Sequence, residues 1–161
     1  MQRSLPTLIA LVLLFSTVGW SADFLKGLAA YEKEEYRTAL REWRPLAEQG
    51  LAEAQFALGE MYRVGQGVPQ NYQTAAKWYR LAAEQGDAQA QYNLGLMYYK
   101  GQGVLKNYVY AHMWLNLSAS QGYEEVAEVR DLLAKDMTPS QIERAQDLAR
   151  ECMKKKFKGC D

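Results

Sequence analysis

The sequence predicts an all-α fold of about four antiparallel helix pairs, and three observations support this prediction. The segment 51–86 recurs as 87–122, apolar residues recur at helical spacing within each copy, and a glycine-rich stretch follows the first helical stripe of each copy. Internal repeats with periods between about 20 and 50 residues are typical of solenoids, in which each unit packs against its neighbours. We therefore expect an elongated stack of helix pairs.

The two copies agree most closely at positions that a packed helix pair requires. They align with a period of 36 residues, and the sequence GQGV is identical in both. Other identities occur at Leu58 and Leu94, at Gly59 and Gly95, at Met61 and Met97, at Tyr62 and Tyr98, and at Trp78 and Trp114. Chance does not explain so many identities at one period.

Two apolar stripes in each copy predict two helices. In the first copy the stripes comprise Ala54, Leu58, Met61 and Tyr62, and then Ala75, Trp78, Leu81 and Ala82. Spacings of three and four residues place such side chains on one face of an α-helix. With the flanking segments included, we expect helices near residues 24–33, 36–49, 52–64, 72–85, 88–100, 108–121, 123–135 and 139–156.

The glycines of the repeat predict close packing and helix termination. Gly59 and Gly95 lie within the first helix of each copy, where Gly is about 1 kcal/mol less favourable than Ala. We expect them to allow a close approach of the second helix. The loops Gly65-Gln66-Gly67 and Gly101-Gln102-Gly103 follow a helix, as helix-terminating glycines do. A phosphate-binding loop would instead follow a strand and begin a helix, so we favour termination.

The flanking segments are expected to form outer units. Residues 23–50 keep helical spacing between Gly27, Ala39 and Trp43 but lack the GQG loop. Residues 123–157 lose the repeat signature, yet Thr138 followed by Pro139 is typical of a helix N-terminus. We expect these residues to form a capping pair, because a solenoid needs an end unit with a polar outer face.

Residues 1–22 have the features of a secretory signal peptide. Arg3 precedes an apolar run from Leu8 to Phe15, and small residues follow. An uncleaved membrane anchor is the alternative, but a membrane-spanning helix needs roughly 20 apolar residues and this run is shorter. We therefore expect an exported protein, periplasmic if the source is bacterial, with cleavage between Gly19 and Ala22 and no stable membrane anchor afterwards.

Composition narrows the classes of function. The 19 basic and 19 acidic residues cancel, which argues against a nucleic-acid-binding surface. His112 is the only histidine, and no Ser or Cys nucleophile stands in a recognisable catalytic motif. We therefore expect neither catalytic residues nor a metal site or cofactor.

The pattern AxxQxxLGxMYxxGQGVxxNYxxAxxWxxLAxxQG over residues 51–122 resembles the Sel-one-like repeat, a relative of the tetratricopeptide repeat. The resemblance implies a right-handed α-α superhelix that binds another protein or a peptide through its concave surface. It leaves two alternatives, a regulatory or inhibitory subunit of an envelope enzyme and a cell-envelope hydrolase of β-lactamase type. The hydrolase activity has been proposed for cysteine-rich relatives with a disulfide in each repeat, and this chain lacks those cysteines.

Cys152 and Cys160 leave two interpretations open. Export would expose the chain to an oxidising compartment and favour a disulfide between them. Cys152 equally fits the apolar stripe of the last helix as a buried thiol. A continuous helix would separate the pair by about 12 Å, beyond the roughly 7 Å that a disulfide spans, so a disulfide requires the helix to end before Gly159.

Candidate binding residues come from the first helix of each copy, which lines the concave groove in tetratricopeptide-like stacks. The two copies differ at several positions of this helix that lie outside the packing stripe. With a neighbouring tyrosine, the candidates are Ala57, Glu60, Arg63, Val64, Tyr92, Asn93, Leu96, Tyr99 and Lys100. Variation at positions released from packing is consistent with recognition and equally with neutral drift.

The signal-peptide hypothesis predicts the mass of the exported protein. The mature chain is expected to start between residues 20 and 23, and intact-mass spectrometry of the secreted or periplasmic fraction measures this directly. A mass that still includes residues 1–20 would contradict the hypothesis.

Overall fold

The computed structural model describes residues 22–160, so the expected signal peptide lies outside the described residues except for Ala22. Within this range every regular element is a helix. The first helix spans residues 22–32. It is followed by α2 (Tyr36–Glu48), α3 (Ala52–Val64), α4 (Tyr72–Ala83), α5 (Ala88–Lys100), α6 (Tyr108–Ala119), α7 (Glu124–Ala134) and α8 (Pro139–Lys154). The predicted helix bounds agree with these to within two residues.

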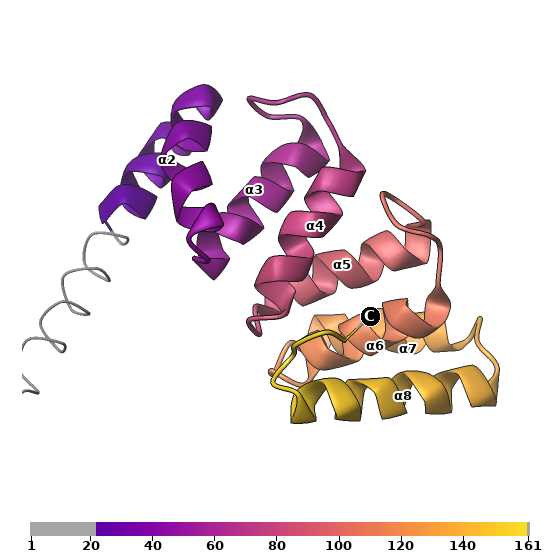
Figure 1. The fold of residues 1–161 in the computed structure, drawn as a ribbon. Coiled ribbons are helices and arrows are strands. Elements are labelled where there is room, and N and C mark those ends of the chain that lie inside the picture. Colours follow the sequence, from indigo (N-terminus) through magenta and orange to yellow (C-terminus); the bar gives the residue numbers. More distant parts are fainter. Residues whose placement is uncertain (1–21, 161) are drawn as a thin grey trace, which may run out of the picture.

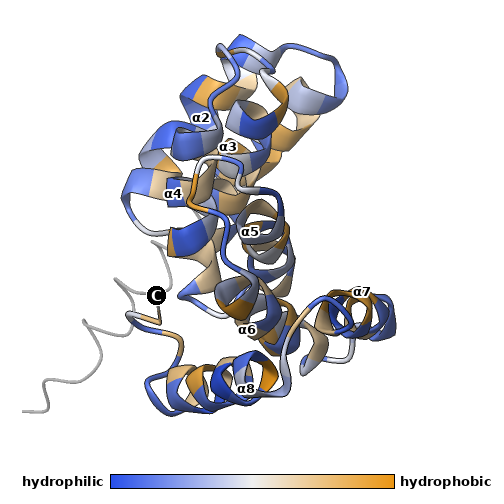
Figure 2. Cartoon of the chain, turned by 90° about the vertical axis from the view of Figure 1, so that its right-hand side faces the viewer, coloured by the Kyte–Doolittle hydropathy of each residue, from blue (hydrophilic) through white to orange (hydrophobic). Residues whose placement is uncertain are grey.

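The helices form a solenoid, which confirms the predicted fold class. From α2 to α7 each helix packs against the next one in the chain, and α8 packs against α6. Figure 1 shows the helices arranged as a curved stack that runs from the indigo N-terminal end to the yellow α8. Figure 2 shows hydrophilic and apolar residues on the same helices, as expected where one face of each helix packs inward.

The helix ends follow the local chemistry of the sequence. Gly65 and Gly101 adopt left-handed conformations at the C-termini of α3 and α5, with φ of 85° and 70°. The side chains of Asn71 and Asn107 accept hydrogen bonds from backbone N–H groups at the starts of α4 and α6. At α8, Thr138 forms the predicted N-terminal cap. Each cap gives a partner to a backbone group that the helix leaves unpaired.

The glycines within α3 and α5 allow the second helix of each pair to approach closely, as predicted. A Cβ atom at Gly59 would lie 2.6 Å from the ring of Tyr79. A Cβ atom at Gly95 would lie 3.0 Å from Cγ of Leu115. Neither helix pair could keep its present spacing with a larger residue at these positions.

The second glycine of each GQG loop packs against the preceding unit, a contact that the sequence did not indicate. A Cβ atom at Gly103 would lie 2.2 Å from the carbonyl oxygen of Tyr72, at the start of α4. Gly67 contacts Tyr36, at the start of α2, in the equivalent way. The loop therefore ends one helix and also fixes the contact between units.

The predicted apolar stripe of α4 is partly wrong. Trp78 is only half-buried, and Leu81 is 44% exposed. Tyr79, which the stripe omitted, is completely buried and packs against Gly59. In α6 the equivalent stripe is correct, because Trp114 and Leu117 are both fully buried.

The difference between α4 and α6 arises from α8. Met113 and Leu117 of α6 belong to the same buried cluster as Ala145 and Ala149 of α8. Within residues 22–160 no helix packs on α4 as α8 packs on α6. The position of Met113 is accordingly occupied in the preceding unit by the exposed Lys77. Identical residues at the repeat period therefore have different environments.

The chain reverses direction after α8 and closes a disulfide. Helix α8 ends at Lys154, ahead of Gly159 as a bridge requires. Lys156, Phe157 and Gly159 have positive φ angles, and a disulfide joins the buried Cys152 and Cys160, whose Cα atoms are 5.1 Å apart. The reversed segment reaches the turn after α4, where the Gly159 N–H donates a hydrogen bond to Glu84 Oε1 at 3.3 Å.

The two equivalent tryptophans give a matched test of this packing. We expect Trp114→Ala to lower the free energy of unfolding by about 3–5 kcal/mol, because Trp114 is fully buried. We expect Trp78→Ala to cost clearly less, because part of that ring already faces solvent. Chemical denaturation of both variants measures the difference, and equal losses would contradict the packing role assigned to α8.

Candidate functional site

Three connected pockets run along one face of the stack. The N-terminal pocket, of about 310 Å³, lies between the first helix, α3 and the start of α5. The central pocket, of about 330 Å³, lies between the starts of α5 and α7, and the C-terminal pocket, of about 300 Å³, between their ends. Gln89 lines the first two pockets and Val129 the last two. We call the surface formed by these three pockets the pocket face.

A larger pocket elsewhere is less suited to recognition. It has a volume of about 530 Å³ and is lined only by residues of α8, most of them charged. This pocket is the space between long side chains that extend from a single helix. We therefore place the candidate site on the pocket face.

Four aromatic rings, those of Phe24, Tyr31, Trp43 and Phe56, line the N-terminal pocket. Phe24 stacks on Trp43 with ring centroids 5.6 Å apart, and Tyr31 contacts Trp43 at 5.5 Å. On the α3 side, Phe56 lies against Tyr79, with centroids 5.9 Å apart. The pocket is lined by Phe24, Leu28, Tyr31, Trp43, Glu53, Phe56, Ala57, Glu60, Asp87 and Gln89. Of the predicted binding residues, it brings together Ala57 and Glu60.

Acidic side chains border this apolar pocket. Glu53 lies in the first turn of α3, and Asp87 caps the N-terminus of α5 by accepting a hydrogen bond from the Ala90 N–H at 2.7 Å. Burial raises the pKa of Asp87, hydrogen bonds from the N–H groups of Ala90 and Gln89 lower it, and the charge of Glu53 adds a smaller increase. The charges of Glu53 and Asp87 therefore interact, and both carboxylates lie at the N-terminal pocket.

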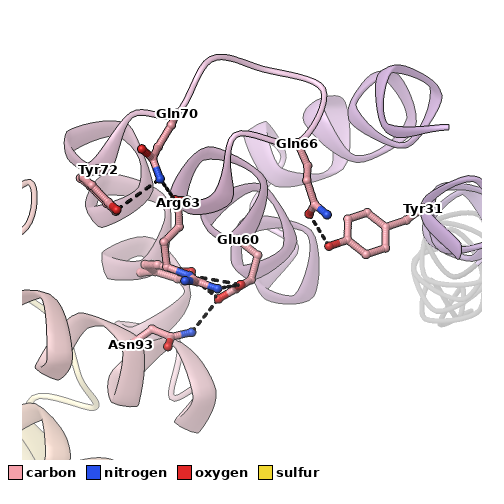
Figure 3. A network of polar contacts seen from close by, with 8 residues as sticks. Tyr31, Glu60, Arg63, Gln66, Gln70, Tyr72 and Asn93 are labelled. Atoms are coloured by element: carbon pink, nitrogen blue, oxygen red, sulfur yellow. Dashed lines mark hydrogen bonds and ion pairs between the residues drawn. The ribbon is translucent and has the colours of Figure 1, made fainter. Parts of the chain in front are cut away.

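A polar network fixes three of the predicted binding residues (Figure 3). Glu60 forms an ion pair with Arg63 at 2.6 Å and accepts a hydrogen bond from Asn93 Nδ2 at 2.9 Å. It also accepts a hydrogen bond from the hydroxyl of Tyr79. Burial, reinforced by this carboxylate, raises the pKa of Tyr79, so the phenol stays protonated. The network joins α3, α4 and α5, and these side chains stabilise the pocket face.

The other candidates lie around the second half of the face. Tyr92 lines the central pocket, and Leu96, Tyr99 and Lys100 line the C-terminal pocket. The Tyr99 ring stacks on Tyr108 at 5.6 Å, with Lys106 Nζ 5.0 Å from the Tyr108 centroid. Tyr99 is nevertheless 36% exposed. The structure thus brings Leu96, Tyr99 and Lys100 into one pocket with Leu132 of α7, which is 59% exposed.

Three predicted binding residues, Arg63, Asn93 and Val64, line none of these three pockets. Arg63 and Asn93 instead contact Glu60, which lines the N-terminal pocket. Val64 has no such contact among the described residues. It lies at the end of α3 and is 47% exposed. Its side chain is accessible, but it stands apart from the other candidates. A position that differs between the two copies is therefore not automatically part of the pocket face.

Four glutamines hold successive units together, a role that the sequence analysis missed. Gln55 Nε2 donates a hydrogen bond to the Ala47 carbonyl at 3.0 Å, and Gln85 Nε2 donates to Gln55 Oε1 at 2.8 Å. Gln91 and Gln121 repeat this arrangement one unit later. The same residue type recurs one repeat period apart, at Gln55 and Gln91 and at Gln85 and Gln121, and this recurrence is the signal that the sequence contains. The backbone carbonyl in the preceding unit that accepts the hydrogen bond is not visible in a sequence.

His112 is poorly placed for catalysis. It is buried in α6, where burial, together with the charge of Arg130, lowers its pKa. Its Nδ1 atom has no hydrogen-bond partner among the described residues. The described part of the chain also contains no group of three His, Cys, Asp or Glu side chains that could hold a metal ion.

Among the helices of residues 22–160, none combines the length and the apolar character that a membrane crossing requires.

Comparisons with known proteins agree with this architecture. The model of the Sel1 repeat matches residues 52–87 and 88–123. Among solved structures, a protective antigen of uropathogenic Escherichia coli with an SLR fold is 32% identical, with a TM-score of 0.81 over 88% of this chain. A Sel1 repeat protein from Oxalobacter formigenes is 34% identical, with a TM-score of 0.68 over 81% of this chain.

This chain spans only part of these two relatives. It covers 31% of the Escherichia coli protein and 55% of the Oxalobacter formigenes protein. Among curated proteins, no sequence matches the chain. The resemblance to Sel-one-like repeats is confirmed by the repeat matches and by the shared fold.

The burial of His112 predicts a pH-dependent stability. Its pKa in the folded protein lies below the ordinary value of 6.5, so as the pH falls the unfolded chain binds a proton before the folded chain does. The free energy of unfolding should therefore decrease as the pH falls through about 6.5. His112→Ala, which introduces the residue found at the equivalent Ala76, should remove this part of the pH dependence in denaturation experiments. An unchanged profile would show that His112 does not titrate in this way.

Proposed function

We propose that this chain, which contains two Sel1 repeats, is an exported scaffold that binds another protein or a peptide through its pocket face. Folds of this kind typically mediate protein–protein interaction. The observation that carries the proposal is the set of connected pockets with accessible apolar side chains. Leu28, Tyr99 and Leu132 are 37%, 36% and 59% exposed on this face. Aromatic and apolar residues in pockets supply most of the binding energy at protein interfaces.

Three further observations support export. Residues 1–22 have the charge and hydrophobicity pattern of a signal peptide. The disulfide between Cys152 and Cys160 is of a kind that persists in oxidising compartments outside the cytoplasm. The similar Escherichia coli protein is described as a protective antigen, a property that fits a protein accessible from outside the cell. These observations favour a periplasmic or secreted location.

Capture of a partner tests the proposed face. The mature protein, immobilised and incubated with envelope extract, should retain a partner that the double variant Leu96→Ser with Tyr99→Ala no longer retains. The variant removes apolar contacts from the C-terminal pocket, and its melting temperature should stay within roughly 5 °C of the parent. A captured envelope enzyme whose activity changes on binding would favour the regulatory alternative.

A matched control removes apolar side chains elsewhere. Leu81 and Leu105 are 44% and 89% exposed and lie outside the pocket face. The double variant Leu81→Ser with Leu105→Ser should retain the partner fully. Loss of the partner in this control, with retention in the Leu96 and Tyr99 variant, would place the binding surface on the other side of the stack.

A further inference from the structure

We infer that the N-terminal pocket binds a partner segment that is both apolar and basic, in which a large aliphatic or aromatic side chain is flanked by lysine or arginine. The inference rests on the proposed function, because it specifies the partner chemistry for one part of the pocket face. Two properties of the pocket support it, a preformed apolar lining and an acidic border.

The apolar lining is held in place before any partner binds. The Trp43 ring is buried beneath Phe24 and Tyr31, and its Nε1 donates a hydrogen bond to the Phe24 carbonyl at 3.0 Å. The Tyr31 hydroxyl donates to Gln66 Oε1 at 2.6 Å, which ties the first helix to the next unit. A pocket whose rings are already ordered loses little conformational entropy on binding. An apolar side chain that enters it also covers the exposed part of Leu28.

The charges around this pocket have one sign. Its lining contains three carboxylates, those of Glu53, Glu60 and Asp87, and no Lys or Arg among the described residues. Arg63 neutralises Glu60 from outside the lining. For Glu53 and Asp87 the described part of the chain supplies no ion pair, and only the amide groups at the starts of α3 and α5 offset their charge. A cation beside the pocket would therefore be attracted and an anion repelled.

The acidic border distinguishes this pocket from the other end of the face. The C-terminal pocket carries one charge of each sign, Lys100 and Asp136. The N-terminal pocket therefore selects the charge of the partner, whereas the C-terminal pocket has no net preference. A bound segment would place its basic residues near the starts of α3 and α5.

Synthetic peptides test this inference directly. The probe is a short peptide with Phe and Leu placed between lysines, and two matched peptides replace either the lysines by Glu or the Phe and Leu by Ser. Calorimetry with the mature protein should show binding of the first peptide that is at least roughly tenfold tighter than that of either matched peptide. Its affinity should fall as the salt concentration rises.

Two variants assign the binding to the pocket. Glu53→Gln combined with Asp87→Asn keeps a side chain that can cap α5 and removes both charges. It should weaken the lysine peptide roughly tenfold and abolish the discrimination against the Glu peptide. Leu28→Ser should weaken both peptides that contain Phe and Leu. The control Glu143→Gln, on the exposed side of α8, should leave all affinities unchanged, and circular dichroism confirms that each variant is folded.

Each outcome is decisive for the inference. Equal affinity for the lysine and Glu peptides would overturn the charge preference while leaving the pocket face as a binding surface. Binding that survives both pocket variants, or no binding by any peptide, would overturn the inference as a whole. The capture experiment above is independent of these peptides, so the proposed function stands or fails separately.

Discussion

The close contact between the two helices of a unit is the constraint on which the rest of the structure depends. At Gly59 the absence of a side chain lets the Tyr79 ring lie directly on α3. In that position the Tyr79 hydroxyl reaches Glu60, which in turn accepts a hydrogen bond from Asn93 of the next unit. One small residue therefore determines the helix spacing, the polar network and the position of α5 relative to α3. The shape of the pocket face follows from this chain of contacts.

The sequence predicted the helices well because their signals are local. Helical periodicity, asparagine caps and left-handed glycines act within a few residues, and the repeat presents each signal twice. The core of α4 was predicted less well, because the stripe treated Trp78 and Trp114 as equivalent. Their environments differ because α8 packs on α6, whereas no helix from α2 to α8 packs on α4 in the same way. A repeat shows which residues correspond, but the neighbours of each unit decide which residues are buried.

The candidate site was predicted in part for a related reason. Differences between the copies at Glu60 and Asn93 indicate freedom from packing, whereas the structure shows a hydrogen bond from Asn93 to Glu60. Residues one unit apart can vary together when they form one contact, and a comparison of two copies does not reveal this. The aromatic lining contributed by Phe24 and Tyr31 also escaped prediction, because those residues lie outside the clear repeats and reach the pocket only through tertiary packing.

The two ends of the described chain, residues 22–160, are held by different kinds of contact. At the C-terminal end the disulfide closes a loop whose Phe157 lies against Gly86, and Gly159 is hydrogen-bonded to Glu84. These contacts hold the segment that follows α8 against the turn between α4 and α5. At the N-terminal end the first helix is held by ring stacking and by two side-chain hydrogen bonds, from Trp43 and Tyr31. Helices with few tertiary contacts open at the lowest cost in free energy. A partner segment seated between the first helix and α3 would add contacts to both helices, so binding there would also stabilise the N-terminal unit.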